Sequence, residues 1–326
     1  MRAVNMCINL MKKILFICGS LNQTTQMHQI ARQLTDFDCY FTPYYGDGLI
    51  KTLTRSGLLN FTILGGAFRQ TTEHYFQEHR CPIDYEGRTN HYDLVLTCSD
   101  LIVQKNVRKK KIILVQEGMT DPENIIYHLV RRLGLPRYLA STSTTGLSHN
   151  YHKFCVASEG YRDLFVRKGV SPEKIAVTGI PNFDNARQYL DNDFPHRNYV
   201  LVATSDSRET FKFDNRKAFL RKALSIARDR QIIFKLHPNE NFRRSSTEIK
   251  RFAPHALIFH EGNAHHMVAN CHTLITQYSS LAFTGIALDK EVHSYFDGDM
   301  LKRLNPIQND GNSAKNIAKV CRSYLQ

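Results

Sequence analysis

A polar turn near the C-terminus carries hydroxyl groups that could hold a phosphate. The apolar residues 274–276 lead into the turn 277–280, which contains Tyr278, Ser279 and Ser280 and precedes a short apolar helix pattern. Backbone N–H groups at the start of a helix have no partner within it, and with the helix dipole they attract anions. The serine hydroxyls add donors, although either serine could simply cap the helix. The turn therefore indicates phosphate binding or a helix cap.

A second turn combines a cation and an imidazole at the end of a strand. Residues 231–236 predict a buried strand, and His237 and Pro238 follow it, since proline ends strand pairing. Lys235 lies two residues before His237 and therefore projects from the same face of the strand. A cation beside a histidine suits an anion better than an apolar core. We therefore predict that Lys235 and His237 bind phosphate, and the alternative is a buried histidine with a structural hydrogen bond.

A third turn, at residues 178–184, follows the predicted strand 174–178 and reads Thr-Gly-Ile-Pro-Asn-Phe-Asp. In order and spacing, the three turns resemble motifs of the GT-B glycosyltransferase superfamily, above all those of CDP-glycerol glycerophosphotransferases and UDP-GlcNAc 2-epimerase-like enzymes. Those families carry a "TGNPRFD"-like turn, a "KLHP" strand end and a "TDYSS" turn. The resemblance covers residues 150–295. Gln277 stands where the pattern has aspartate, and the third turn lacks the usual asparagine.

The resemblance implies the GT-B fold, with two Rossmann-like doubly wound α/β domains facing a cleft. The strand and helix patterns agree, because strand–turn–helix units run through the chain in two successive rounds. We predict an acceptor-binding domain at 1–185 and a nucleotide-donor-binding domain at 186–326, whose last helix could pack back on the first domain. By the same resemblance, His237, Ser279 and Ser280 lie at the donor phosphates.

Two further residues of the second half are candidates for donor binding. The polar loop 204–208 follows the first strand of that domain, and Arg208 could grip a phosphate with its planar fork. Glu261 follows another predicted strand, at a place where this fold commonly reads the nucleoside, and it could accept a hydrogen bond from a ribose hydroxyl. A surface arginine and a solvent-facing glutamate are the structural alternatives.

The first half must supply a base, because an attacking alcohol loses its proton to a nearby carboxylate or histidine. In the glycerophosphotransferase-like relatives, a histidine occupies an "HG" turn of the first domain. The comparable turn here, 116–118, reads Gln-Glu-Gly. The resemblance therefore indicates Glu117 as the base and Asp121 as the second candidate. Ion pairing by Glu117 and helix capping by Asp121 are the structural alternatives, and His149 and His152 are weaker candidates.

Composition restricts the possible partners and the compartment. The 326 residues carry a formal charge of +13, which favours a nucleic acid, an anionic membrane or a phosphorylated substrate as partner. No apolar run approaches the ~18 residues of a membrane span. The eight cysteines are scattered without a Cys-x-x-Cys pair, so we expect free thiols in a cytoplasmic protein. Residues 1–10 are interpreted as an upstream extension.

No metal is expected in the protein. His265, His266 and His272 are close in sequence, but no carboxylate or cysteine falls at ligand spacing with them, and adjacent histidines on a helix point apart. GT-B enzymes as a class do not need a metal, and no other cofactor is predicted.

Our first functional hypothesis is a metal-independent transferase that moves a sugar from a nucleotide-sugar to a cell-surface glycan or lipid-linked acceptor. Its charge would help it sit on the inner face of an anionic membrane. The alternatives are a CDP-polyol glycerophospho- or ribitol-phosphate transferase, a UDP-GlcNAc 2-epimerase-like enzyme, and a non-catalytic binder of nucleic acid or acidic glycan. Nucleic acid is not the expected partner, because no patch of interleaved aromatic and basic residues occurs.

Overall fold

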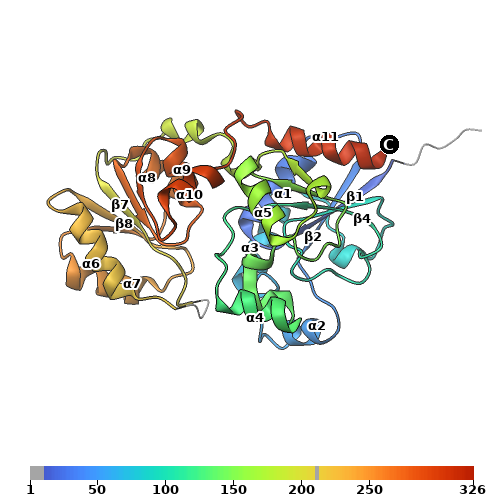
Figure 1. Cartoon of the computed structure of the whole chain (residues 1–326), viewed down its shortest axis with the longest axis horizontal. Coiled ribbons are helices and arrows are strands. Elements are labelled where there is room, and N and C mark those ends of the chain that lie inside the picture. The colour runs from blue at the N-terminus through green and yellow to red at the C-terminus, as the bar shows by residue number, and fades with distance from the viewer. Residues whose placement is uncertain (1–10, 210–212) are drawn as a thin grey trace, which may run out of the picture.

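The computed structural model describes residues 11–209 and 213–326, which form two parallel β-sheets with flanking helices (Figure 1). This arrangement confirms the predicted α/β fold class. The proposed upstream extension, residues 1–10, lies outside the described residues. The first sheet has the strand order β2-β1-β3-β4-β5-β6. Its strands are β1 (Lys13–Cys18), β2 (Asp38–Pro43), β3 (Leu94–Thr97), β4 (Lys111–Val115), β5 (Lys153–Val156) and β6 (Ile175–Val177).

Helices connect and cover the strands of the first sheet. The α-helices are α1 (Leu21–Ala31), α2 (Gly48–Arg55), α3 (Gly66–Glu78), α4 (Ile125–Leu133) and α5 (Glu159–Lys168). Short 3-10 segments follow at η1 (Tyr85–Gly87), η2 (Arg137–Thr144), η3 (Pro172–Lys174), η4 (Pro181–Phe183) and η5 (Ala186–Leu190). The segments η4 and η5 lead from the first sheet to the second.

The second sheet has the strand order β11-β10-β7-β8-β9. Its strands are β7 (Val200–Ala203), β8 (Ile232–Lys235), β9 (Leu257–Phe259), β10 (Thr273–Thr276) and β11 (Glu291–His293). The helices of this half are α6 (Arg216–Ala227), α7 (Phe242–Phe252), α8 (Ala264–Asn270), α9 (Leu281–Ala287), α10 (Gly298–Leu304) and α11 (Ser313–Leu325). Because β10 and β8 both pair with β7 in parallel, the turns after these three strands meet at one edge.

The central strands are mostly apolar because helices cover both faces of each sheet. In β1, Leu15 and Ile17 belong to one buried cluster, whereas Ile14 and Phe16 belong to the cluster on the opposite face. This alternation follows from the period of two residues along a strand. All four side chains are at most 1% exposed.

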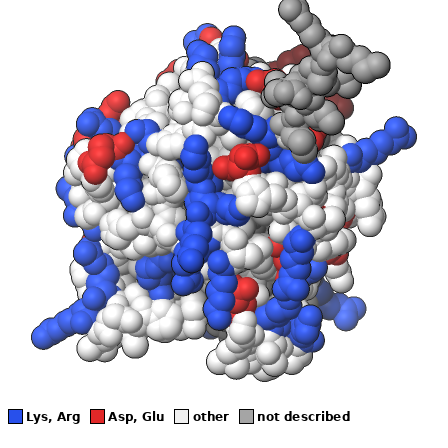
Figure 2. All heavy atoms as spheres, turned by 90° about the vertical axis from the view of Figure 1, so that its right-hand side faces the viewer, with Lys and Arg blue, Asp and Glu red and all other residues white. Residues whose placement is uncertain are grey.

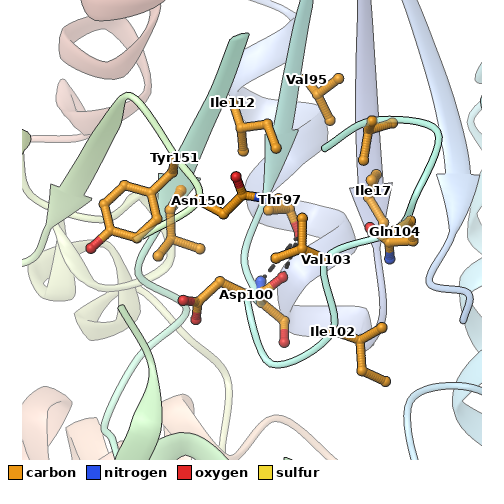
Figure 3. Close-up of a pocket in the computed structure, with 13 residues that line it drawn as sticks. Ile17, Val95, Thr97, Asp100, Ile102, Val103, Gln104, Ile112, Asn150 and Tyr151 are labelled. Carbon is orange, nitrogen blue, oxygen red and sulfur yellow. Dashed lines mark hydrogen bonds between the residues drawn. The ribbon is translucent and has the colours of Figure 1, made fainter. Parts of the chain in front are cut away.

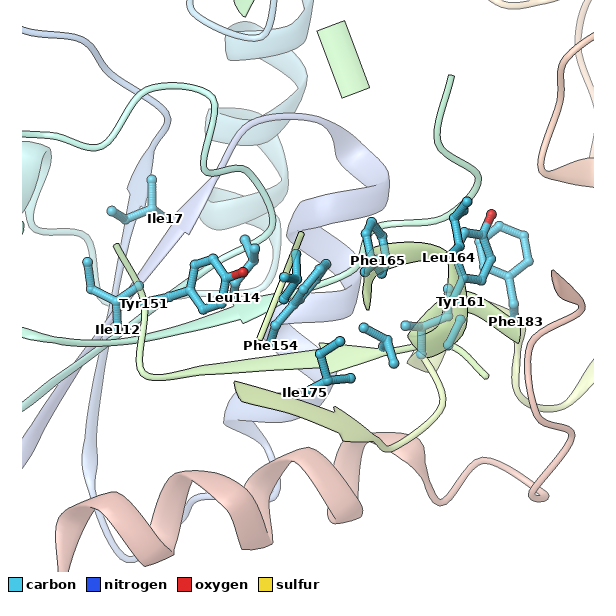
Figure 4. Packing of buried hydrophobic residues seen from close by; sticks show 14 of the residues in the cluster. Ile17, Ile112, Leu114, Tyr151, Phe154, Tyr161, Leu164, Phe165, Ile175 and Phe183 are labelled. Carbon is cyan, nitrogen blue, oxygen red and sulfur yellow. The ribbon is translucent and has the colours of Figure 1, made fainter. Parts of the chain in front are cut away.

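One hydrophobic cluster crosses from the first domain to the second. Figure 4 shows the part of it around Tyr161, Phe165 and Phe183, and the same cluster includes Phe283 of α9. The Phe283 ring lies edge-on to Phe183, with ring centroids 6.1 Å apart. Because Ser279 and Ser280 directly precede α9, this packing fixes the serine turn against the first domain.

The last helix, α11, packs on the first domain, as the red helix beside α1 shows (Figure 1). The third sequence turn holds its start, because Asp184 accepts a hydrogen bond from the Ser313 backbone N–H at 2.8 Å. Gly179 has φ +74°, and a methyl group there would overlap the Ser313 hydroxyl. The turn at 178–184 leads into η4 and η5, where the chain passes to the second sheet, and it also contacts the start of α11, where the chain returns to the first domain.

Two local predictions near α4 were wrong. Helix capping was the structural alternative for Asp121, but the N-cap of α4 is Asn124, whose side chain accepts from the Tyr127 backbone N–H. The run 140–149 is rich in Ser, Thr and Gly, a composition that predicts a loop, but its first half, 140–144, belongs to the partly buried 3-10 segment η2. Among the described residues, no helix is long and apolar enough to cross a membrane.

Candidate functional site

The turn after β4 holds Glu117 beside the start of α1. Ser20, the N-cap of α1, donates to one carboxylate oxygen at 2.7 Å, and Gln23 Nε2 donates to the other at 2.7 Å. Burial raises the pKa of Glu117 above its ordinary value, and the two hydrogen bonds offset that rise only in part. The arrangement provides a fixed carboxyl group that takes up a proton more readily than a solvated glutamate.

Gln116 fixes the backbone that carries Glu117. Its Nε2 donates to the Gly118 carbonyl at 2.8 Å, and its Oε1 accepts from the Ala157 backbone N–H at 2.9 Å. Its own carbonyl accepts from Gln26 at 2.8 Å. Since Gln116 is buried and uses both ends of its amide, the turn has one defined conformation.

The turn after β8 places His237 at the edge of the second sheet. Its Nδ1 accepts from the Asn239 backbone N–H at 3.2 Å, which leaves Nε2 as the nitrogen that bears the proton in the neutral ring. Its own backbone N–H donates to Glu240 at 3.0 Å. Glu240 is buried, and it also accepts from Arg216 at 2.8 Å. The imidazole is therefore held as a hydrogen-bond donor.

The loop after β7 joins the His237 turn to the Gln277 turn. Ser205 Oγ donates to Gln277 Oε1 at 2.6 Å, and the next residue, Asp206, has a carboxylate oxygen 3.6 Å from His237 Nδ1. Gln277 Nε2 donates to Asp214 at 2.9 Å. The glutamine at the usual aspartate position therefore bridges a hydroxyl and a carboxylate. The order β10-β7-β8 brings these three turns to one edge, as the sequence motifs predicted.

The serine turn lies directly against the base candidate's turn. A methyl group built on Gly118 would be 3.6 Å from Ser280 Cβ and 3.4 Å from the Phe183 ring. Gly118 is the neighbour of Glu117, so the structure brings the two predicted halves of the site together. Ser279 Oγ accepts from the Leu281 backbone N–H at 3.3 Å, whereas Ser280, the N-cap residue of α9, makes no side-chain capping hydrogen bond. Tyr278 is half-exposed, with its ring edge-on to Tyr295 at 5.4 Å.

Lys235 and Arg208 are both engaged with protein groups. Lys235 is buried, and its ammonium donates to the carbonyls of Leu236 at 2.9 Å and His260 at 2.8 Å. Burial lowers the pKa of Lys235, and nearby Glu240 offsets this in part. The Arg208 guanidinium donates to Glu248 at 2.9 Å. These contacts favour a structural role for both cations over the predicted phosphate contact.

Glu261 lies apart from the serine turn, at the mouth of a separate cavity. This cavity has a volume of about 820 Å³ and is lined by Phe194, Phe242, His260 and Glu261. It opens where β9 ends, on the edge of the second sheet. A volume of that size with aromatic walls and a few polar groups is typical of small-molecule sites.

Asp121 is held by the η2 segment. Thr142 Oγ1 donates to its carboxylate at 2.9 Å, and the Asp121 backbone N–H donates to the same hydroxyl at 2.8 Å. The η2 segment is in turn anchored by buried Asp100, which pairs with Arg137 at 3.1 Å. Figure 3 shows Asp100 beside a cavity of only about 10 Å³, which is too small for a substrate. Asp121 therefore helps to hold the η2 segment in place.

The remaining histidines lie away from Glu117 or have structural contacts. His152 precedes β5 and therefore lies at the amino end of the strands, opposite the site. The His265 ring stacks on Tyr189 at 4.5 Å, and burial lowers the pKa of His265 to about 4. In the described part of the chain, no cluster of three or more histidine, cysteine or acidic side chains could hold a metal.

The sequence analysis missed the residues that position the site. Ser20 and Gln23 follow β1 by the spacing of an N-cap and its third helical residue, a signal that could have placed them beside Glu117. Glu240 lies three residues after His237, within one turn. By contrast, Asp214 reaches Gln277 from 63 residues away, and no local pattern announces that contact.

No protein-family model and no curated protein matches the chain. Solved structures do match it over most of their lengths. A UDP-GlcNAc 2-epimerase from Methanocaldococcus jannaschii in complex with UDP-GlcNAc and UDP is 14% identical, with a TM-score of 0.58, over 95% of this chain and 99% of that one. The Neisseria meningitidis UDP-GlcNAc 2-epimerase bound to UDP-GlcNAc is 11% identical, with a TM-score of 0.56, over 95% and 100%.

A variant of the wall teichoic acid polymerase TagF is also similar. It is 13% identical, with a TM-score of 0.51, over 96% of this chain and 89% of that one. Identities this low show a shared fold and do not transfer an activity or a residue's role. The two facing parallel sheets, the crossing of α11 back to the first domain and these likenesses together show that the protein has the GT-B fold.

Proposed function

We propose that the protein is a glycosyltransferase that moves a sugar from a nucleotide-sugar donor to a hydroxyl group of a glycan or lipid-linked acceptor. The observation that carries the proposal is the contact between the turn of Glu117 and the turn of Ser280, which come from different domains. The turn that carries a carboxyl group with a raised pKa thus contacts the turn that carries the Ser279 and Ser280 hydroxyls. Likeness to enzymes that bind UDP-GlcNAc supports a nucleotide-sugar donor.

Glu117 would act as the base that takes the proton of the acceptor hydroxyl. Ser20 and Gln23 hold both carboxylate oxygens, so the group is oriented before the acceptor arrives. Its raised pKa makes it a stronger base than a solvated carboxylate, and a general base works best when its pKa approaches the operating pH. Asp121 is the weaker candidate because Thr142 holds it against η2.

The second domain would bind the leaving nucleotide. His237 presents Nε2–H after β8, and the hydroxyls of Ser279 and Ser280 follow β10, on the other side of the central strand β7. Such preorganised donors stabilise the negative charge that grows on a diphosphate as the sugar departs. The proposed transfer uses these donors without a metal. The cavity beside Glu261 and Phe242 has the size for the nucleoside.

Calorimetry with UDP-, GDP-, CDP- and CMP-linked sugars tests donor binding. We expect one donor class to bind, and His237→Ala and Ser280→Ala to weaken that binding by about tenfold or more, the cost of a hydrogen bond to a charged group. His255→Ala and Ser225→Ala, which change exposed positions of the same domain, serve as matched controls. Tight RNA binding with a steep salt dependence, and no binding of any sugar nucleotide, would contradict the proposal in favour of a nucleic-acid binder.

Two other reactions remain candidates because of particular likenesses. The epimerase structures favour a 2-epimerase, which would convert a UDP-sugar without any acceptor. The similarity to the wall teichoic acid polymerase TagF favours transfer from a CDP-polyol. Against that reaction, the glycerophosphotransferase-like enzymes that the sequence resembles have a histidine in the turn where this chain has Glu117. Incubation with each donor alone and then with an acceptor separates the three. Epimerisation needs no acceptor, and polyol-phosphate transfer consumes the CDP-polyol rather than the nucleotide-sugar.

A further inference from the structure

Helix α4 exposes an apolar face that packs on no part of the protein described here. Ile125 is 78% exposed, Leu133 63%, Ile126 50% and Leu129 47%. At about 100° per residue, these four positions fall within an arc of ~100° on the helix surface. Tyr127 and Val130 occupy a separate arc and are buried against the domain. The helix is therefore apolar on two sides, although only one of them has a partner within the fold.

The exposed apolar surface continues beyond the end of α4. Gly134 ends the helix in the left-handed conformation, and three large apolar side chains after it are again 40% to 51% exposed. Single exposed apolar residues are ordinary, but a contiguous group on a small domain marks an interaction surface. We call this group the α4 face; it comprises Ile125, Ile126, Leu129, Leu133, Leu135, Tyr138 and Leu139.

Within the stretch that carries the α4 face, the charged side chains are all basic. No aspartate or glutamate occurs between Glu123 and Glu159, whereas Arg131, Arg132 and Arg137 all lie in that stretch. Arg131 donates to the Tyr127 hydroxyl and Arg137 pairs with Asp100, so both are tied to the protein. Arg132 is exposed, and on the helical wheel it lies about 20° from Ile125. The apolar arc is thus bordered by the exposed Arg132, and the carboxylate that precedes it in sequence, Glu123, lies before the helix begins.

An apolar arc bordered by cations fits the interface of an anionic lipid bilayer, where lipid tails take up the apolar side chains and phosphates attract the basic ones. We propose that the α4 face docks the protein on such a bilayer, with Ile125, Leu129 and Leu133 entering the headgroup region and Arg132 meeting lipid phosphates. The net charge of +13 would draw the protein to that surface from a distance.

The position of α4 gives this docking a consequence for the acceptor. The helix begins eight residues after Glu117, and it lies on the side of the first domain that faces the second (Figure 1). A bilayer on the α4 face would contact the domain that holds the proposed base, within the roughly 26 Å that eight extended residues can span. Resting on the proposed transferase function, we infer that the acceptor hydroxyl belongs to a lipid-borne molecule presented at the membrane surface.

A purely electrostatic surface is the competing explanation for membrane contact. Figure 2 shows many Lys and Arg side chains on the end of the first domain that is turned away from the second domain. The basic run 108–111 precedes β4 at the amino end of the strands, away from Glu117. It has cations without an exposed apolar group beside it, so it provides a control for charge alone.

Sedimentation of the full-length protein with lipid vesicles tests the docking. We expect binding to vesicles of phosphatidylcholine mixed with phosphatidylglycerol and weak binding to phosphatidylcholine alone. The double variant Ile125→Asp/Leu129→Asp should lower the partition coefficient by at least about tenfold, because two apolar groups are replaced by charges that the lipid repels. Arg132→Ser should lower it about fivefold. Leu190→Asp, at a 55% exposed site elsewhere, and Lys109→Ser are the matched controls.

A fluorescence measurement reports insertion directly. The protein contains no tryptophan, so Leu133→Trp introduces a single reporter on the α4 face and Leu190→Trp a single reporter outside it. On anionic vesicles, we expect a blue shift and quenching by brominated lipid for Leu133→Trp only. Equal quenching of both reporters, or equal sedimentation of the double variant and the wild type, would overturn the proposal.

Two outcomes separate this inference from the proposed function. If the α4 face instead joins a second copy of the chain, the wild type will form dimers without lipid and the double variant will be monomeric in sedimentation equilibrium, which refutes docking. Calorimetry of the double variant with the sugar nucleotide should match the wild type. If the wild type binds the sugar nucleotide but no vesicles, the docking proposal is refuted and the transferase proposal is unaffected. If the wild type binds vesicles but no sugar nucleotide, the transferase proposal is refuted and docking is unaffected.

Discussion

Glu117 in the first domain and Glu240 in the second are both carboxylates at the carboxyl ends of parallel strands. Glu117 accepts hydrogen bonds from two neutral groups, the Ser20 hydroxyl and the Gln23 amide. In the described part of the chain, no lysine or arginine pairs with it. Glu240 accepts from Arg216 at 2.8 Å, and from the His237 backbone at 3.0 Å. One carboxylate therefore has oriented but uncharged partners, and the other is neutralised.

This difference separates a carboxylate with only uncharged partners from one that a buried arginine holds in place. A buried carboxylate without a cation gains a proton readily, which is why burial raises the pKa of Glu117. A buried carboxylate paired with arginine keeps its charge and fixes the groups around it. Glu240 holds the backbone of His237 and also receives the Thr204 hydroxyl. We therefore assign proton transfer to the first domain and a preorganised anion site to the second.

The largest effect is expected for Glu117→Gln, which keeps the shape of the side chain and removes its basicity. We expect kcat to fall by about 10²- to 10⁴-fold, the usual contribution of a general base, while the calorimetric affinity for the donor stays within a few-fold of wild type. Single-turnover transfer assays measure the rate. Asp121→Asn is the matched control, and an equal loss of rate in that variant would move the base to Asp121 and undo the comparison.

The second largest effect is expected for Glu240→Ala, on stability. Removing this carboxylate leaves Arg216 buried beside only Asp214, and breaking such a buried pair costs about 3–5 kcal/mol. Urea unfolding of the full chain measures the loss. Glu248→Ala is the control, because Glu248 pairs with Arg208 at a partly exposed position and its loss should cost less than about 1 kcal/mol. Equal losses for both variants would show that Glu240 is no more than a surface partner.

A smaller effect concerns stability against pH. The folded-state pKa of Glu117 is raised above its unfolded value, so the protonated form favours folding. Its stabilising contribution is complete below the unfolded pKa and is lost as the pH rises through the folded pKa. Glu117→Gln removes this loss, so its melting temperature at neutral pH should equal or exceed that of wild type, with a smaller difference near pH 4. A variant that melts lower at neutral pH would show that the ionised carboxylate stabilises the fold.

Much of the fold followed from local pattern. The buried runs, such as residues 14–18 of β1, are apolar because both faces of the sheet are covered. The polar turns that follow such runs marked the ends of the strands. The three motif turns were correctly expected near strand ends, and parallel pairing then brings them to common edges. The failures were local ones: Asn124 competes with Asp121 for the same cap, and a pattern of Ser and Thr does not distinguish a loop from the 3-10 segment η2.

The chemistry of the site was less predictable than its location. A lysine at a strand end can face a ligand or satisfy carbonyls, and Lys235 does the latter through contacts to Leu236 and His260. Arg208 was expected to have an open fork, but it meets Glu248 from a helix 40 residues away. Such pairings depend on tertiary distances that spacing in the sequence does not encode. The predicted roles of His237, Ser279 and Ser280 in donor binding stay predictions until calorimetry tests them.

The smallest and most specific effect is expected for Ser20→Ala. The Ser20 hydroxyl donates to the Glu117 carboxylate at 2.7 Å and so lowers the pKa that burial raises. Without it, the pKa of Glu117 rises further, and a smaller fraction of the base is ionised at a given pH. We expect kcat/KM at neutral pH to fall by about tenfold or less, and the acid limb of its pH profile to move to higher pH, with recovery at alkaline pH.

Thr25→Ala is the control, because Thr25 lies about one turn further along α1 and does not contact Glu117. It should leave the acid limb of the pH profile of kcat/KM at its wild-type position. Helix capping could also be weakened, because Ser20 accepts from the Gln23 backbone N–H. Ser20→Thr keeps both the cap and the hydroxyl, so it should restore the wild-type profile if the hydroxyl acts on Glu117. A uniform loss of rate at every pH in Ser20→Ala would instead assign Ser20 to the helix alone, and Glu117 would then lose its claim to be the titrating base.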